Sequence, residues 1–312
     1  MTNFTLGATY RNGSINTANE IVPQIAAFKA SPEEEHIFEQ RENMVSFYQV
    51  TSALENGIIT KLDKTVLSLI AVFASAACTT KTLFEMLTLM GVDVNRNTLE
   101  SSVKRLHKYH LINFSRFKSP DGKQSNTRII TLMKYGSQLA KSLGVIHHFN
   151  PIATAAAEPY AIKSRIETAQ LICNWLKNLP VDSFSVRPVK VVDADAGAII
   201  RPAATIDVWG ETIYFEVPRK HDGCIEDLLE KLNRYKLVFG KDNLPTIVIN
   251  GEDLDMNLEI HKALNTTDIK AEILFTDDLA MFGPGFMTSL YNFDSSNRKN
   301  RYTIEKIESE AV

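Results

Sequence analysis

Hydrophobic residues recur at a helical spacing three times between residues 63 and 111, and they then alternate on both sides of a strong turn. The turn is Pro120-Asp121-Gly122, and the alternating runs are 112–117 and 128–132. A further helical run covers 135–143. The residues that precede the three helical runs are short polar residues of the kind that cap helices, namely Asp63, Thr79 or Thr80, and Asn95 or Asn97.

Three short helices, a β-hairpin and a closing helix follow one another in the order of a winged helix-turn-helix domain. We predict this domain over residues 61–145, with its third helix as the recognition helix and its hairpin as the wing. Residues 1–60 are predicted to be a loosely ordered arm, because the first 30 of them hold few large apolar side chains.

A second domain is predicted over residues 158–291, after the alanine-rich segment 153–157. Helical and strand-like patterns alternate along it, which favours an α/β sheet over a helical bundle. A polar C-terminal tail is predicted over 292–312. The expected elements of the second domain are a helix at 162–179, strands at 184–192, 198–209 and 212–217, a helix at 222–239, a strand at 246–249, a helix at 256–264 and a strand at 272–275.

Charge is concentrated in the first domain. Between Asn95 and Val145 there are ten Lys and Arg residues against two acidic ones, a net charge of +8, whereas the whole chain carries −3 and the remainder therefore −11. A local basic region on a recognition helix and wing is typical of a surface that binds DNA phosphates. The predicted DNA contacts are Arg96, Asn97, Ser101, Lys104, Arg105, Lys108, Arg116, Lys118, Lys123 and Arg128.

Of these residues, Asn97, Ser101 and Lys108 are expected to point toward base edges, and the other basic side chains toward phosphates. Two alternatives remain for the same pattern. The basic residues can form a solvated face without a ligand, and a winged helix can serve as a protein-binding module.

Three short motifs mark the second domain: Arg201-Pro202, Phe215-Glu216-Val217 followed by Arg219, and Lys231-Leu232-Asn233-Arg234-Tyr235. They resemble the R-P-D motif, the F-(L/E)-E-(V/I)-D-R strand and the K-L-x-R-Y helix of the replication-relaxation family of mobile-element and plasmid proteins. The resemblance runs from about residue 60 to 250, and members of that family join a winged helix to a second domain. The αβββαβ order also looks like the PD-(D/E)xK fold of restriction-endonuclease-like proteins. The resemblance implies a DNA-binding protein acting in replication, mobilisation or their control.

In the nuclease-like fold, two carboxylates on adjacent strands hold Mg²⁺ or Mn²⁺, and a lysine polarises the phosphate or water. Glu216 stands at the position of one carboxylate and is the predicted metal ligand, but Ala203 replaces the other. Natural loss of the aspartate and an engineered Asp-to-Ala change would each explain this alanine. Pro218 replaces the expected lysine. The prediction is therefore a degenerate site that requires no cofactor.

Two alternatives remain for this site. In an active Mg²⁺-dependent endonuclease, Glu216, Lys231 as a displaced lysine and Asp207 as a displaced carboxylate would be catalytic. Asp207 is a poor substitute, because four residues along a strand span about 13 Å. Alternatively, Glu216, Arg219, Lys231 and Arg234 form an ion-paired group that only joins the hairpin to the helix.

The expected partner is double-stranded DNA, with a second copy of the chain and replication or mobilisation proteins as further candidates. A transcriptional regulator whose α/β domain only dimerises is the other functional alternative. No membrane partner is expected, because the longest apolar stretch falls short of the ~20 residues that span a bilayer. Three distant cysteines and the absence of a basic, apolar leader predict a cytoplasmic protein.

Overall fold

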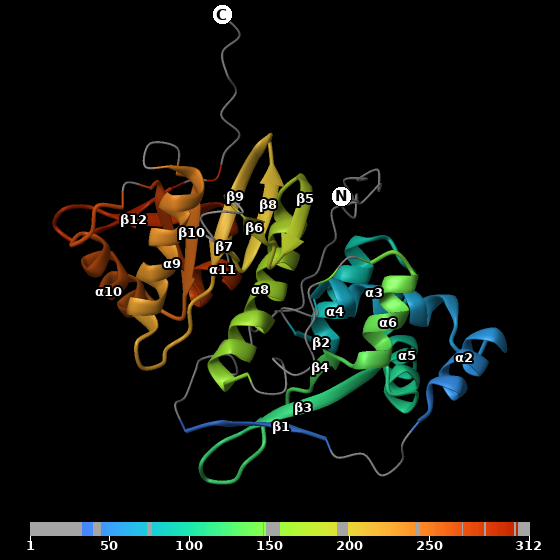
Figure 1. Ribbon diagram of the computed structural model, residues 1–312. Helices are drawn as coiled ribbons and strands as arrows, with labels where there is room; N and C mark the ends of the chain where they lie inside the picture. The colour runs from blue at the N-terminus through green and yellow to red at the C-terminus, as the bar shows by residue number, and fades with distance from the viewer. Residues whose placement is uncertain are drawn as a thin grey trace, which may run out of the picture. The chain divides into compact units, whose positions relative to one another are not determined.

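The structure is a computed structural model and describes residues 33–39, 45–73, 77–145, 147, 157–191, 199–240, 244–269, 271–283, 285–302 and 304. The chain is a mixed α/β protein, and its described residues divide into two compact units (Figure 1). The N-terminal unit ends at Cys173, and the C-terminal unit begins at Asn174. Within the described ranges, no helix combines the length and hydropathy needed to cross a membrane.

The N-terminal unit contains the helices and the hairpin predicted over residues 61–145. Its sheet is antiparallel in the order β1-β3-β4-β2. Gly122 N donates to Ser119 O in the turn between β3 and β4, and Gly122 has a positive φ of 84°. The elements are β1 (Glu35–Phe38), α2 (Phe47–Glu55), α3 (Lys61–Phe73), β2 (Cys78–Thr79), α4 (Thr80–Leu89), α5 (Arg96–Lys108), β3 (Ile112–Lys118), β4 (Ile129–Leu132) and α6 (Lys134–Ser142).

Two of the three predicted helix caps are confirmed. The Thr79 side chain caps α4 by accepting from Thr82 N, and Asn95 caps α5 by accepting from Thr98 N. Asp63 is not a cap, which corrects the prediction. It lies in the first turn of α3 and accepts from Thr60 N, while Thr60 Oγ1 accepts from Asp63 N, so Thr60 precedes the helix in a reciprocal capping arrangement.

The prediction of a loosely ordered arm up to residue 60 is wrong for two segments. Glu35–Phe38 forms β1, which pairs with β3 in the register Glu35↔Lys118 to Phe38↔Ser115. Ser46 and Gln49 form a capping box that starts α2, and Val50 and Ala53 are buried on that helix. Residues 1–32 and 40–44 lie outside the described residues.

The division between the units falls inside α8 (Pro159–Asn178) rather than at the predicted boundary of 158. Lys163 pairs with Glu34 and lies over the Phe117 ring, and Cys173 Sγ lies 3.9 Å from Thr82 O. These contacts assign the larger part of α8 to the N-terminal unit.

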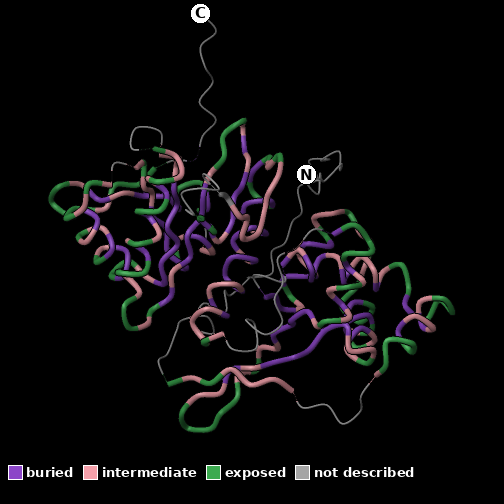
Figure 2. The backbone as a smooth tube through the Cα atoms, viewed as in Figure 1, coloured by how far each residue is buried: buried purple, intermediate pink, exposed green. Residues whose placement is uncertain are grey.

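The C-terminal unit is built on a seven-stranded mixed sheet in the order β13-β12-β11-β10-β9-β8-β5, with β9, β10 and β11 parallel. Figure 2 shows the buried residues concentrated along its central strands. The elements are β5 (Val181–Val186), β6 (Lys190–Val191), β7 (Ile199–Ile200), β8 (Ala204–Val208), β9 (Glu211–Glu216), α9 (Cys224–Phe239), β10 (Ile247–Gly251), α10 (Leu254–Leu264), β11 (Ile273–Asp277), α11 (Asp278–Phe282), η1 (Phe286–Thr288), β12 (Tyr291–Phe293) and β13 (Lys299–Arg301).

The two faces of this sheet are covered differently. On one face Tyr214, Ile249 and Phe275 join a core with residues of α9 and α10, including Leu232 and Ile260. On the other face Trp175, at the end of α8, packs edge-on against Phe215 and Phe286 with ring centroids 4.9 and 5.6 Å away. Because side chains alternate along a strand, Glu216 falls on the α9 face with Tyr214.

Two predicted strands, 184–192 and 198–209, are each interrupted. The first divides into β5 and β6 around Arg187, which has a φ of +47°, and the second divides into β7 and β8 at Arg201–Ala203. Arg187 N donates to Ala203 O, so the two interruptions lie opposite each other. A left-handed residue cannot continue a strand, and Pro188 and Pro202 lack the N–H that a ladder requires.

The predicted polar tail from residue 292 is also corrected, because β12 and β13 extend the sheet. Phe293 is 8% exposed and packs against Phe275 and His261. The sequence 291–301 is polar apart from its aromatic residues, and these aromatic residues attach it to the core. Residues 305–312 lie outside the described residues.

Asp63→Asn is expected to destabilise the N-terminal unit by about 2 kcal/mol at pH 7, because hydrogen bonds to a buried charge contribute roughly 1.5–3 kcal/mol. Arg105 holds the pKa of Asp63 below its usual value, so the contribution is complete above the unfolded pKa and is lost as pH falls through the folded pKa. Urea unfolding followed by far-UV circular dichroism should show a flatter acid dependence in D63N.

The exposed Asp93→Asn is the matched control for this change. Both tryptophans, Trp175 and Trp209, belong to the C-terminal unit, so their fluorescence transition should not move. Equal stability of D63N and D93N would contradict a structural role for the Asp63 carboxylate.

Candidate functional site

The exposed side of α5 is the first candidate site. Asn97, Ser101, Lys104 and Lys108 are spaced by four, three and four residues, so they form one stripe along the helix, and all four are exposed. Arg96 is exposed at its N-terminal end, with its guanidinium 5.7 Å from the Phe84 ring centroid. The stripe has no acidic residue, and Leu99, Ser102, Val103 and Leu106 are buried on the opposite side.

The other five predicted DNA contacts form ion pairs within the protein. This changes the charge balance derived from the sequence, because Glu35, Glu39 and Asp63 lie outside the basic segment but pair with residues inside it. The pairs are Arg105–Asp63, Arg116–Glu39, Lys118–Glu35, Lys123–Asp121 and Arg128–Glu100. The hairpin therefore presents less net positive charge than its sequence indicates.

Arg105 is half-buried and is directed toward Asp63 rather than along the exposed stripe. Its Nε and Nη2 atoms donate to the two oxygens of Asp63 at 2.8 and 3.1 Å, and Ser102 Oγ donates to the same carboxylate at 2.6 Å. Burial by itself raises the pKa of Asp63, but the bonds from Arg105, Ser102 and Thr60 outweigh it and lower that pKa. The carboxylate stays ionised and fixes α5 against α3.

The second candidate site surrounds Glu216 at the end of β9, where the side chain is 3% exposed. Lys231 Nζ donates to Glu216 Oε2 at 2.5 Å, and Tyr235 Oη donates to Oε1 at 2.7 Å, both from α9. Burial raises the pKa of Glu216, while the charge and hydrogen bond of Lys231 oppose the rise. Both oxygens of the carboxylate are therefore already engaged.

The strand pairing brings Ala203 opposite Glu216. Ala204 is paired with Phe215, and Ala203 N donates to Phe215 O at 2.9 Å, so residue 203 faces residue 216 across the two strands. Asp207 lies at the other end of β8, opposite Thr212, whose hydroxyl donates to it. The structure does not bring Asp207 to Glu216 and Lys231.

A divalent cation does not fit the Glu216 site. Its ligands would be oxygen atoms, but the facing residue is an alanine and a lysine ammonium lies at one Glu216 oxygen. Across the described residues, no group of three or more His, Cys, Asp or Glu side chains is placed to hold a metal ion.

The surroundings of Glu216 are cationic. The pKa of Arg187 is lowered by burial and by the charge of Arg201, while Glu216 opposes the change. Lys231 and Arg187 thus both act on the Glu216 charge, so two cations face a single carboxylate. This arrangement favours an anion over a metal ion.

The predicted ion-paired group of four residues forms only in part. Glu216 pairs with Lys231, but Arg234 pairs with Glu230 one turn away on its own helix. Arg219 is 1% exposed and pairs with Asp278 instead of Glu216: its Nη2 donates to Asp278 Oδ1 at 3.0 Å.

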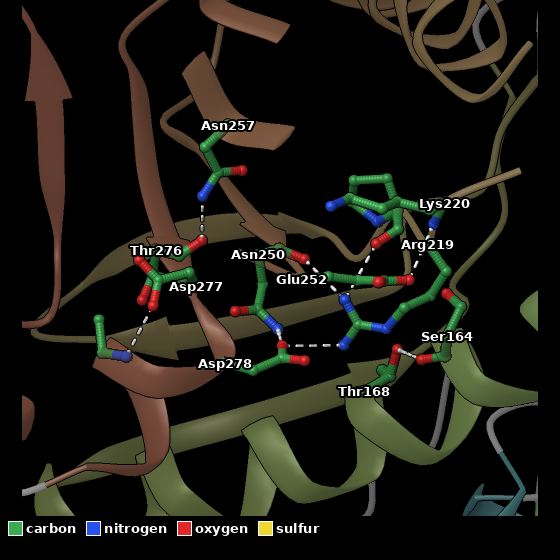
Figure 3. Close-up of polar contacts among 12 residues, drawn as sticks. Ser164, Thr168, Arg219, Lys220, Asn250, Glu252, Asn257, Thr276, Asp277 and Asp278 are labelled. Atoms are coloured by element: carbon green, nitrogen blue, oxygen red, sulfur yellow. Dashed lines mark hydrogen bonds and ion pairs between the residues drawn. The ribbon is translucent and has the colours of Figure 1, made fainter. Parts of the chain in front are cut away.

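Arg219 and Asp278 belong to a buried polar cluster at the carboxyl ends of β9, β10 and β11 (Figure 3). Asn250 Nδ2 also donates to Asp278 Oδ1, and Arg219 Nη1 donates to Asn250 O. Glu252 accepts from Lys220 N at 2.9 Å. Burial raises the pKa of Asp278 to about 6, with Arg219 opposing the rise and Glu252 adding to it.

Next to this cluster is a cleft of about 510 Å³, lined among others by Asp253, Asp255, Asp277, Lys299 and Arg301. The sequence analysis missed both features. The available signal was the polar residues that directly follow two buried strands, Asn250 to Asp253 and Thr276 to Asp278, since the carboxyl ends of parallel strands meet at one edge of a sheet.

No protein-family model matches this chain, and no curated protein matches it. Among solved structures, the crystal structure of protein VC1899 from Vibrio cholerae is similar at 11% sequence identity, with a TM-score of 0.28. The match covers 80% of this chain and 57% of the other, so the chain spans little more than half the length of that protein. At this level the similarity assigns neither fold nor function.

Ala203→Asp is expected to create a Mn²⁺ site, because the new carboxylate would face Glu216 across the two strands. Isothermal titration of Mn²⁺ should give measurable binding to A203D, and negligible heat with the unaltered chain and with the A203D/E216Q double variant. Equal, negligible heats for all three would contradict the paired-strand geometry. Cleavage of plasmid DNA by the unaltered chain in Mn²⁺ would contradict the degenerate site.

Asp278→Ala is expected to destabilise the C-terminal unit by about 3–5 kcal/mol, because it removes the carboxylate that pairs with the buried Arg219 charge. Asp278→Asn keeps an acceptor for Arg219 and should cost less. The folded pKa of Asp278 is raised to about 6, so its ionisation opposes folding as pH rises from the unfolded pKa toward 6.

Urea unfolding followed by tryptophan fluorescence tests this at several pH values. The unaltered chain should lose stability between about pH 4 and pH 6, and D278N should lose less over the same range. A D278A variant as stable as the unaltered chain would rule out the Arg219–Asp278 pair as a stabilising contact.

Proposed function

We propose that this protein binds double-stranded DNA through its N-terminal unit and that this unit is a winged helix-turn-helix domain. The observation that carries the proposal is the exposed stripe of α5, where Asn97, Ser101, Lys104 and Lys108 align. The neighbouring acidic residue, Glu100, is paired with Arg128. Such a stripe offers phosphate-binding cations together with short polar side chains that can reach base edges.

The order of elements supports the same interpretation. Helices α3, α4 and α5 are followed by the β3–β4 hairpin and by α6, and α5 stands at the position of a recognition helix. In this arrangement Arg96 and Lys104 contact phosphates. Lys108, for which the sequence predicted a base contact, contacts a phosphate as well. The hairpin contributes weakly, because Glu35 and Glu39 of the β1 segment pair with Lys118 and Arg116.

For the C-terminal unit we propose a restriction-endonuclease-like fold without nuclease activity. The sequence α8, β5, β8, β9, α9 and β10 follows the αβββαβ order, and the interrupting β6–β7 pair stands apart from the main sheet. Ala203 and the Lys231–Glu216 pair support a site that requires no divalent ion. The resemblance to the replication-relaxation family favours a role in the replication, mobilisation or control of a mobile genetic element.

The double variant K104E/K108E is expected to weaken duplex binding and to lower the slope of log K against log salt by about two units, because each phosphate contact contributes roughly 0.9. Both side chains are exposed, so the fold should not change. Fluorescence anisotropy of a labelled duplex across a range of salt concentrations measures both quantities.

The matched control is K141E/K177E, which reverses two exposed lysines on α6 and α8. It should leave the salt slope almost unchanged. If the two double variants weaken binding equally, the affinity responds only to the net charge of the protein and not to the position of the lysines. Unchanged binding by K104E/K108E would refute DNA contact by α5.

A further inference from the structure

A second surface lies at the C-terminal end of α5. A pocket of about 320 Å³ forms between α2 and this end, with Tyr48, Tyr109, Ala53, Ile58 and Lys108 among its lining residues. Tyr48 is 79% exposed and Ile58 45% exposed, so both present apolar surface at this pocket. The pocket thus joins aromatic and apolar walls to one cation.

We propose that this pocket binds an unpaired nucleobase of DNA. A base has flat apolar faces that stack on aromatic side chains, and each base carries a phosphate that a nearby cation can bind. Here Tyr48 and Tyr109 offer the aromatic surfaces, and Lys108 lies within 5.9 Å of the Tyr109 ring centroid. A base within a duplex already stacks on both faces, so only an unpaired base can enter.

The position of Lys108 supports this occupant over others. It is the last residue of the α5 stripe and also lines the pocket, so a strand that follows the stripe reaches the pocket without leaving the protein surface. The inference rests on the proposed function and specifies its substrate: duplex DNA that adjoins a single-stranded segment.

The polar groups of the pocket predict little base selectivity. Gln49 Oε1 accepts from Ser46 in the capping box, and Ser52 Oγ accepts from Asn56 Nδ2. Stacking then provides most of the recognition, and stacking tolerates any base.

The test compares a blunt duplex with the same duplex carrying a 3′ or a 5′ single-stranded extension that contains 2-aminopurine. The full chain should bind one extended duplex at least about fivefold more tightly than the blunt one, as expected for one stacked base, and should quench the 2-aminopurine fluorescence. Tyr48→Ala should abolish both effects, whereas Tyr48→Phe should retain them, because the ring remains.

Leu237→Ala, which removes an exposed apolar side chain in the C-terminal unit, is the matched control and should change neither effect. Equal affinity for blunt and extended duplexes, with K104E/K108E still weakening both, would overturn this inference and leave the proposed function intact. Binding of no DNA would overturn both. If Y48A changes the oligomeric state in sedimentation but binds the extended duplex as tightly as the unaltered chain does, the inference is overturned and the pocket contacts a second copy of the chain.

Discussion

The buried carboxylate of Asp63 determines how the N-terminal unit presents its surface. Together with Thr60 it forms the reciprocal capping arrangement at the start of α3, and it holds α5 through Ser102 and through two nitrogens of Arg105, Nε and Nη2. An ionised group without exposure to water persists only when such partners surround it. Because Arg105 is directed toward Asp63, it does not belong to the exposed stripe of α5.

Two buried carboxylates of the C-terminal unit are stabilised in the same way, by a cationic partner. On the α9 face of the sheet, Lys231 balances the charge of Glu216 and Tyr235 donates a hydrogen bond to it. At the carboxyl ends of the strands, Arg219 balances the charge of Asp278. The first pair joins β9 to the helix that follows it, and the second joins segments 59 residues apart, so each contributes more to the choice of one arrangement than an exposed ion pair would. The engaged Glu216 also explains why a site of this shape does not favour a metal ion.

Charge in the sequence and charge on the surface differ in this protein. A window from 95 to 145 counts +8, but Glu35, Glu39 and Asp63 from outside that window neutralise three of its arginines and lysines. Among the described residues, Lys104 and Lys108 of α5 form no ion pair, and they lie on one side of the helix, with Lys108 at the pocket. The surface proposed to bind DNA is therefore the exposed stripe of α5, which is smaller than the basic segment 95–145 that suggested it.

The sequence by itself determined the elements with local causes: the capped helices α4 and α5, the hairpin around Gly122, and α9 and α10, whose apolar residues repeat at a helical spacing. The position of Ala203 opposite Glu216 was expected from the resemblance alone, and the register of β8 and β9 agrees with it. Only the tertiary structure decided what depends on distant partners. β1 and β12–β13 gain their strand conformation from pairing and burial, and Arg105, Arg219 and Lys118 each bind a carboxylate 42, 59 or 83 residues away. Such pairs leave no periodic signal, because Coulomb attraction depends on distance in space and not on separation along the chain.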